Sequence, residues 1–319
     1  DGTKPHIQTI ISKPVADETI RDEFEKGTID FYSAGTGEKI EAALTKVEEG
    51  KLDANYGLVP GTRINEMRYM CDFGPTQFEE VRRAIAYIVD RDEINKQLTG
   101  GYGTVVDCYA TDATTDFAAI KDDIESELIH YSYDLDKAKE CLEAAGYSDT
   151  DGDGIVDKDG ENLSLTISIS NGSSTAVSET LQDMWKQIGV DVQIEMLENV
   201  SDKRAAGDFD MLVSPNWQTV NAGDGQKYLM NRWSDGGSDN YSGYHSDEFQ
   251  AVLDKLDAAF TQEDRVSAFV EAQQVLADDA PAIWMYANEN VTLVNSKIEN
   301  VTVFPIDYYL VTNKWTLAE

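Results

Sequence analysis

The chain has little positive charge to set against its negative charge. Its 319 residues include 26 lysines and arginines and 60 aspartates and glutamates, which gives a formal net charge of -34. A field of that sign repels phosphate groups, so nucleic acid is excluded as a partner. The sequence also lacks an apolar run of the roughly 20 residues that a membrane-spanning helix needs. No charged, apolar and small-residue signal opens it, so we expect a soluble protein whose export signal is absent from this chain.

Cysteine and histidine are scarce as well. The three cysteines, Cys71, Cys108 and Cys141, cannot all pair, and none has the CxxC spacing of a zinc or redox site. We interpret them as small hydrophobic residues. The three histidines lie far apart and form no HExxH motif, and no nucleophile motif is present. A zinc enzyme or a catalytic triad is therefore not expected, although carboxylate pairs for glycoside cleavage leave an extracellular hydrolase as an alternative.

What the sequence does contain is a regular alternation of elements. A chain of 319 residues can bury a sizeable core and is most simply organised as two lobes. Within the first seventy residues, apolar patterning predicts strand, helix, strand and helix in turn, over residues 7–11, 18–25, 29–32 and 39–48. This alternation indicates an α/β layer.

Helical patterns with clear ends follow. Apolar residues at helical spacing predict a helix over residues 78–88. Asp92 is expected to cap a second short helix that ends at Gly100, and Asp134 to cap a third that ends at Gly146. These helices precede the clearest strand signals of the chain.

A parallel crossover unit is predicted in the centre of the chain. The stretch LSLTISIS, residues 163–170, alternates apolar and polar residues, and VDVQIEM, residues 190–196, does so again after a helical pattern over 177–188. Strand, helix and strand with short connections indicate a right-handed crossover. A third strand, FDMLV, is predicted at 209–213. Two further helices and a last strand are predicted at residues 249–260, 266–276 and 282–294.

The stretch DTDGDGIVDKDG, residues 149–160 and here called the acidic loop, has five carboxylates in twelve residues. The ligand positions of a calcium loop are occupied by Asp149, Asp151, Asp153, Asp157 and, through its carbonyl, Ile155. Position twelve, a bidentate Glu in such loops, is Gly160. Both a bound structural calcium ion and a solvated connector fit this pattern, since exposed charges repel by only about 1 kcal/mol. No other cofactor is required.

The predicted strand at 209–213 leads into a polar segment with a large aromatic residue. Trp217 follows the strand, and Gln218, Thr219 and Asn221 come directly after it. Open α/β sheets bind ligands at the carboxyl ends of their strands. An indole offers broad apolar contact and the neighbouring side chains offer hydrogen bonds, so the segment is a candidate ligand site. Packing of Trp217 in the core is the alternative.

The order of these segments resembles a known family, the solute-binding proteins of peptide-type ABC importers. The resemblance extends over nearly the whole chain and rests on VRRAIAYIVDRDEI at 81–94, YDLDKAKECLEAAGY at 133–147, LQDMWKQIGVDVQIEML at 181–197, GDFDMLVSPNW at 207–217, YSGYHSDEFQAVLDKL at 241–256 and EAQQVLADDAPAIWMY at 271–286. Residues 7–31 look like a stretch that in the family lies inside the first lobe.

The resemblance implies a two-lobed α/β fold of the periplasmic-binding-protein type II, truncated at its N-terminus. Residues 1–72 would form a partial first lobe, 73–287 a complete second lobe, and 288–319 the return to the first. It implies capture without catalysis: a monomeric extracytoplasmic receptor, periplasmic or lipid-anchored, closes its lobes on a peptide or similar solute and docks on a membrane permease. A calcium-dependent surface-binding module is the other alternative.

The family also implies ligand contacts at particular residues. Trp217, Gln218, Thr219 and Val220 would line the cleft, and Arg204 matches a position that is often basic in peptide receptors. Peptide receptors commonly have an Asp three residues after the strand-end Trp, where this chain has Val220. An unpaired buried ammonium is costly. Asp224 could replace that carboxylate, or the solute is a sugar, a modified peptide or another small molecule.

Overall fold

The structure, a computed structural model, divides into two compact units. It describes residues 4–34, 38–111, 113–114, 130–170, 175–218, 225–305 and 311–318. Unit 1 contains residues 1–62, 95–104 and 287–319, and unit 2 contains residues 63–94 and 105–286. Two of the four divisions fall inside long strands, β2 (Ala54–Tyr69) and β9 (Ala282–Asn295). Compared with the lobes expected from the resemblance, unit 2 begins ten residues earlier and leaves residues 95–104 to unit 1.

Unit 1 is built on a short antiparallel ladder. Its elements are α1 (Asp17–Glu25), β1 (Phe31–Ala34), α2 (Glu38–Glu48), β10 (Ile298–Glu299) and β11 (Thr316–Leu317), together with parts of β2 and β9. β1 pairs antiparallel with β9. Buried residues from both helices and both strands form one core: Phe24, Tyr32, Ala43, Leu44, Val291 and Leu293. The predicted strand at 7–11 is wrong, because these residues have no ladder partner and Ile10 and Ile11 are exposed.

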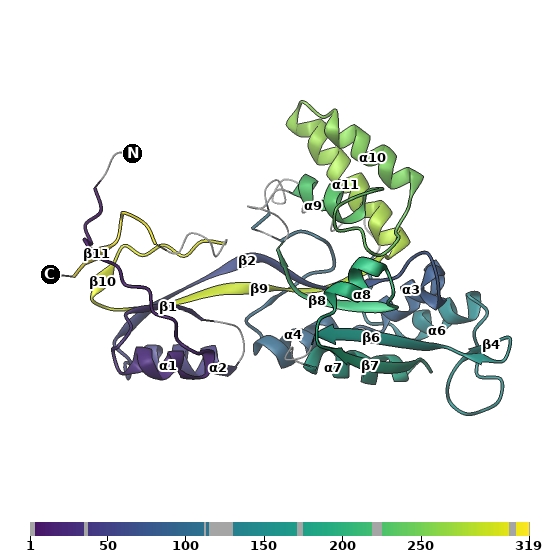
Figure 1. The fold of residues 1–319 in the computed structure, drawn as a ribbon, viewed down its shortest axis with the longest axis horizontal. Coiled ribbons are helices and arrows are strands. Elements are labelled where there is room, and N and C mark those ends of the chain that lie inside the picture. Colours follow the sequence, from purple (N-terminus) through teal and green to yellow (C-terminus); the bar gives the residue numbers. More distant parts are fainter. Residues whose placement is uncertain are drawn as a thin grey trace. The chain divides into compact units, whose positions relative to one another are not determined.

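Unit 2 contains the predicted crossover. β6 (Ser164–Ser170) and β7 (Asp191–Leu197) pair in parallel, and α7 (Ala176–Lys186) connects them. β8 (Met211–Gln218) pairs in parallel with β6 on its other side, so the crossover and the third strand are confirmed. The sheet order is β1-β9-β2-β8-β6-β7, and β3 (Thr104–Val105) pairs with β9. Figure 1 shows β6 between β7 and β8.

The helices of unit 2 begin and end largely where the sequence indicates. After η1 (Pro75–Gln77), α3 (Glu79–Tyr87) packs against α6 (Leu135–Ala144), which Asp134 caps as predicted. In α4 (Arg91–Thr99) the capping carboxylate belongs to Asp90, which accepts a hydrogen bond from the Glu93 N–H, so the Asp92 cap is wrong. α10 (Asp247–Asp257) and α11 (Gln262–Asp279) lie side by side (Figure 1).

Several elements were not indicated by the sequence pattern. β2 is 16 residues long, and its inner half buries Thr62, Asn65, Glu66 and Arg68. Polar residues at buried positions break the apolar alternation on which strand prediction depends. α8 (Ser201–Ala206) and α9 (Gly225–Trp233) were also missed, and β4 (Asp157–Lys158) and β5 (Glu161–Asn162) form a small hairpin in the acidic loop. Phe260, expected on the apolar face of α10, follows that helix and is 97% exposed.

The cysteines behave as small hydrophobic residues. All three are free, with Cys108 buried and the other two half-buried. Burial raises the pKa of the Cys108 thiol to about 12 and that of Cys71 to about 11, so neither is a reactive thiolate at neutral pH. Within the described part of the chain, no helix combines the length and apolar character needed to cross a bilayer.

Candidate functional site

The candidate ligand site begins at the carboxyl end of β8, which pairs with β2 on one side and with β6 on the other. In the register with β2, Trp217 is opposite Ile64 and Gln218 is opposite Arg63. β8 runs parallel to β6, and in this register the last residue of β6, Ser170, is level with Ser214, so β8 continues beyond β6 to Gln218. The structure describes the backbone of Trp217 and Gln218. Thr219, Val220, Asn221 and Asp224 lie outside the described residues.

Arg204 lies in the last turn of α8, the helix that precedes β8 in the chain. The helix ends at Gly207, whose φ of 64° is the left-handed conformation that glycine adopts readily. The Arg204 guanidinium lies over the Tyr241 ring, 5.2 Å from its centroid. Its Nε is buried and has no hydrogen-bond acceptor among the described residues. The side chain is therefore held by stacking, with part of its hydrogen-bonding capacity unused.

Buried charged residues from α9 and from β2, the strand that pairs with β8, form a cluster. It consists of Glu66, Arg68 and Arg232, each only 1% exposed, and is called the arginine cluster below. Glu66 Oε1 is 2.7 Å from Arg232 Nη2 and 3.7 Å from Arg68 Nε. Glu66 and Arg68 share one face of β2, since side chains alternate along a strand. Sequence reasoning missed these residues because β2 was not predicted.

Two aromatic residues extend the hydrogen bonding from Glu66 Oε2, whereas Glu66 Oε1 has no hydrogen-bond partner among the described residues. The Tyr228 hydroxyl donates to Glu66 Oε2 at 2.7 Å, and the Trp284 indole N–H donates to the Tyr228 oxygen at 3.1 Å. Burial and the neighbouring Glu66 raise the pKa of Tyr228, so its phenol stays protonated. Burial and repulsion from Arg232 lower the pKa of Arg68 to about 10, which leaves it charged at neutral pH.

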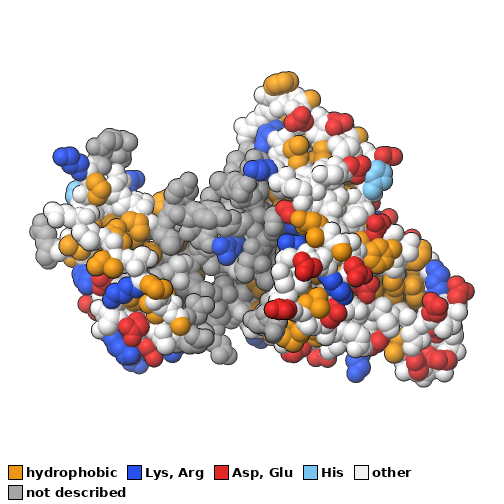
Figure 2. Space-filling view, in the orientation of Figure 1, with side chains coloured by type: hydrophobic (Ala, Val, Ile, Leu, Met, Phe, Trp, Pro, Cys, Tyr) orange, Lys and Arg blue, Asp and Glu red, His pale blue; other side chains and the backbone are white. Residues whose placement is uncertain are grey.

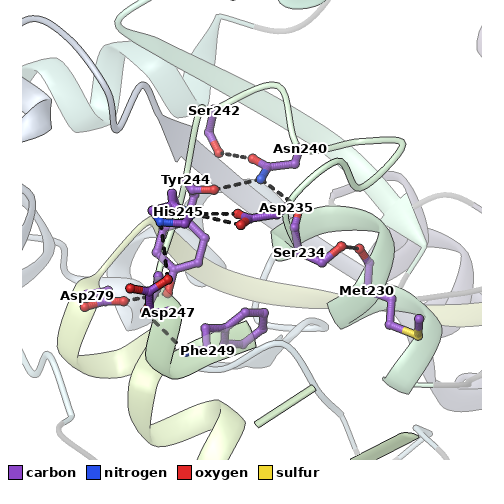
Figure 3. Close-up of polar contacts among 11 residues, drawn as sticks. Met230, Ser234, Asp235, Asn240, Ser242, Tyr244, His245, Asp247, Phe249 and Asp279 are labelled. Atoms are coloured by element: carbon purple, nitrogen blue, oxygen red, sulfur yellow. Dashed lines mark hydrogen bonds and ion pairs between the residues drawn. The ribbon is translucent and has the colours of Figure 1, made fainter. Parts of the chain in front are cut away.

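The segment that follows α9 holds one Arg68 contact in place. Arg68 Nη1 donates to the carbonyl oxygen of Asp239 at 2.9 Å. Figure 3 shows the hydrogen bonds that fix the surrounding residues: the Asn240 amide donates to the carbonyl oxygens of Ser234 and Tyr244, and Ser242 donates to the Asn240 side chain. Tyr244 in turn donates to Asp279. The segment is thus a closely bonded loop that presents a carbonyl to Arg68.

The acidic loop brings together three of its predicted metal ligands. Carboxylate oxygens of Asp149, Asp151 and Asp153 lie within 4.8 Å of one another, and all three residues are exposed. Figure 2 shows acidic side chains gathered at the end of unit 2 where Figure 1 labels β4. Asp157 is 5% exposed, and its carboxylate accepts hydrogen bonds from the backbone N–H and the hydroxyl of Thr150. Ile155 donates its backbone N–H to Asp153.

Solved structures share the fold of this chain. The oligopeptide-binding protein AppA from Bacillus subtilis, in complex with a nonapeptide, superposes with a TM-score of 0.77 at 21% identity, over 95% of this chain and 59% of that one. NikA from Brucella suis, in complex with Fe(III)-EDTA, gives a TM-score of 0.79 at 19% identity, over 95% and 60%. The fold is therefore the α/β fold of periplasmic-type binding proteins, as expected from the sequence.

The family follows from the sequence comparison. The family model described as bacterial extracellular solute-binding proteins, family 5 Middle, matches residues 1–240, and the chain belongs to this family. It is 24% identical to the oligopeptide-binding protein AppA of Bacillus subtilis strain 168 over 99% of its length, and 24% identical to the dipeptide-binding protein of Escherichia coli K12 over 96%. It spans 57% and 54% of these relatives.

Proposed function

We propose that the protein is the extracytoplasmic substrate-binding component of an ABC importer. It captures a peptide or a similar small solute and delivers it, as a monomer, to a membrane permease. The observation that carries this proposal is the family match over residues 1–240 together with the shared fold over 95% of the chain. The relatives named for oligopeptides and dipeptides favour a peptide or peptide-like solute.

The ligand contacts in this proposal come from the end of β8. Trp217 would stack on the solute, and Gln218, Thr219, Val220, Asn221 and Asp224 would surround it. The position of Trp217 and Gln218 at the carboxyl end of a strand parallel to β6 supports this assignment. Arg204, held against Tyr241, would supply a positive charge at the same region. Lipid anchoring or free diffusion in a periplasm is compatible with the same role.

Ligand-induced stabilisation without turnover tests the proposal. A solute that binds only the folded protein raises the melting temperature with concentration. We expect shifts with peptides or peptide-like solutes, and each solute should be recovered unchanged by mass spectrometry. Recovery of cleaved solute would instead favour the hydrolase alternative, and loss of all binding in chelator would favour the calcium-dependent module.

Replacement of the strand-end indole tests the location of the site. Trp217→Ala should weaken solute binding by at least about tenfold in calorimetry, because buried aromatic anchors often contribute 2 kcal/mol or more. Phe260→Ala is the matched control, since that ring is 97% exposed and lies outside the proposed site. Unchanged affinity in Trp217→Ala would place the ligand elsewhere.

A further inference from the structure

The acidic loop contains dipeptides of a kind that can rearrange their own backbone. Aspartate is followed by glycine at four places in the described chain, residues 151–152, 153–154, 159–160 and 235–236. In such a dipeptide the backbone nitrogen of the glycine can attack the side-chain carboxyl carbon of the aspartate, because glycine has no Cβ to hinder the approach. Whether the dipeptide reacts in the folded protein depends on whether both groups are free to meet.

Two of the four dipeptides are held at both groups. The Gly152 N–H donates to Asp149 Oδ1 at 2.7 Å, and the Gly154 N–H donates to Asp149 Oδ2 at 3.1 Å. The carboxylates of Asp151 and Asp153 each accept a hydrogen bond from the backbone N–H two residues further along the chain. These hydrogen bonds must break before either glycine nitrogen can turn onto the aspartate that precedes it.

The dipeptide at residues 235–236 is held at its carboxyl group. His245 Nδ1 lies 2.8 Å and 2.9 Å from the two carboxylate oxygens of Asp235 (Figure 3). The carboxyl group must therefore leave the imidazole before the Gly236 nitrogen can reach its carbon.

Asp159 and Gly160 carry no such restraint. They form the turn between β4 and β5, and both are exposed. Among the described residues, the Asp159 carboxylate accepts no hydrogen bond and the Gly160 N–H donates none. A Cβ placed on Gly160 would meet no atom within 4 Å, so the space around the attacking nitrogen is open.

The backbone of this turn is also easily opened. The φ angles of Asp159 and Gly160 are 55° and 82°, and the left-handed region is unfavourable for a residue with a Cβ. Only two cross-strand positions close the hairpin, Lys158 opposite Glu161 and Asp157 opposite Asn162. Few contacts therefore oppose the rotation that brings the Asp159 carboxyl group to the Gly160 nitrogen.

We propose that Asp159–Gly160 is a site of spontaneous isoaspartate formation. The Gly160 nitrogen bonds to Cγ of Asp159, the bond from Cγ to the carboxyl hydroxyl oxygen breaks, and that oxygen leaves as water with the proton of the nitrogen. A second water then opens the five-membered imide at the α-carbonyl carbon. The chain now runs through Cβ, and the former α-carboxyl group is a free carboxylate.

The net reaction requires only water, changes neither mass nor charge, and lengthens the turn by one backbone atom. It does not depend on the receptor function.

Peptide mapping of the aged full chain tests the proposal. The protein is kept for several weeks at body temperature and neutral pH, digested, and fragmented by electron transfer, which cleaves isoaspartate between Cα and Cβ and so locates it. Isoaspartate at residue 159 should exceed that at each of residues 151, 153 and 235 by at least about fivefold, the factor that corresponds to one hydrogen bond of about 1 kcal/mol. In guanidinium chloride the four dipeptides should react at similar rates, because only the fold distinguishes them.

Asparagine variants give a second measurement with a larger signal. The amide forms the same imide with loss of ammonia, and the hydrolysed products differ from the variant by the exchange of NH for O. Asp159→Asn should lose ammonia at least about fivefold faster than the matched control Asp151→Asn, because the Gly152 nitrogen stays bonded to Asp149. Both positions are exposed, and equal melting temperatures check that both variants keep the fold.

Two results would overturn the assignment. Isoaspartate that forms equally at the four dipeptides in the folded protein, or mainly at residue 151, 153 or 235, would show that hydrogen bonding does not select the site. Isoaspartate at residue 159 that forms in guanidinium chloride and not in the folded chain would show that the turn protects the dipeptide.

Discussion

The acidic loop and the arginine cluster are two concentrations of charge in unit 2 with opposite construction. In the loop, the carboxylates of neighbouring residues are exposed to solvent and accept hydrogen bonds from backbone N–H groups. Asp149, for example, accepts them from Gly152 and Gly154. In the cluster, Glu66 and Arg68 come from β2 and Arg232 from α9, and all are 1% exposed. Asp149, Asp151, Asp153 and Asp157 all accept hydrogen bonds within the loop, whereas Nε and Nη2 of Arg68 have no hydrogen-bond partner among the described residues.

The difference shows that exposure to solvent determines whether a group of charged residues needs partners. Water screens like charges at the surface, so a dense acidic loop costs little and indicates little about function. A buried guanidinium must find partners within the protein or in a ligand. Exposed charge is therefore a weak functional signal here.

We expect the largest change in the free energy of unfolding when a buried ion pair loses its carboxylate, and a much smaller change for an exposed pair. Glu66→Ala leaves Arg232 and Arg68 without their carboxylate and should lower the free energy of unfolding by about 3–5 kcal/mol. The control Glu195→Ala removes an equally short pair, Lys203–Glu195 at 2.6 Å, whose side chains are 30% and 36% exposed. It should cost about 0–1 kcal/mol. Urea denaturation measures the free energy of unfolding of both variants. Equal losses would show that burial does not separate the two ion pairs.

A second comparison lies within the acidic loop. Asp157 is 5% exposed and accepts two hydrogen bonds from Thr150, whereas Asp151 is exposed. Asp157→Ala should cost about 1–3 kcal/mol, since Thr150 loses its acceptor in a partly closed environment. Asp151→Ala should stay within about 0.5 kcal/mol. The same urea experiment applies. Similar losses in both variants would show that burial does not separate these two carboxylates.

The sequence predicts what depends on local pattern. The alternation in LSLTISIS and VDVQIEM fixed β6 and β7, and Asp134 marked the start of α6. The end of the third strand was placed wrongly at residue 213, because Pro215 and the polar residues around it resemble a strand end, whereas β8 continues through Trp217 to Gln218. β2 escaped prediction because its buried positions carry Asn65, Glu66 and Arg68.

The arginine cluster could not be predicted because its members meet only in the folded chain. Glu66 and Tyr228 are 162 positions apart, and no local periodicity relates them. A charged residue in a strand cannot be recognised as part of a buried cluster until the strand is known to be buried. The sequence therefore indicated a candidate ligand segment at the end of β8 but did not indicate the buried charges on the neighbouring strand β2.

Addition of calcium tests whether the acidic loop binds a metal ion, and the expected change in stability is smaller than those above. The expectation of a structural ion stays a prediction, supported by three carboxylates within 4.8 Å. At about 5 mM calcium and a Kd of about 1 mM, typical of extracellular sites, stability should rise by about 1 kcal/mol. Asp151→Asn should remove the rise in melting temperature, and Asp235→Asn should not. A calcium response equal in all three proteins would assign it to general screening of negative charge.

The smallest effect concerns an exposed histidine beside the same segment that contacts Arg68. His245 Nδ1 lies 2.8 Å from Asp235, and its Nε2 lies 3.6 Å from Asp247 (Figure 3). The hydrogen bond to Asp235 and the charges of both carboxylates raise the His245 pKa above 6.5. The contact therefore stabilises the folded protein below the unfolded-state pKa and loses this effect as pH rises through the folded-state pKa.

Titration of the His245 ring by NMR checks this directly. The midpoint should lie above 6.5 in the unmodified protein and move down in Asp235→Asn, which removes the first-named cause of the shift. The melting-temperature advantage over His245→Gln should be present at about pH 5.5 and lost by about pH 8.5. Both changes should be slight because the ring is 63% exposed and solvent screens the pair. An advantage that instead grew with pH would mean that neutral His245 makes the favourable contact, and exposed charge would then matter less here than the geometry suggests.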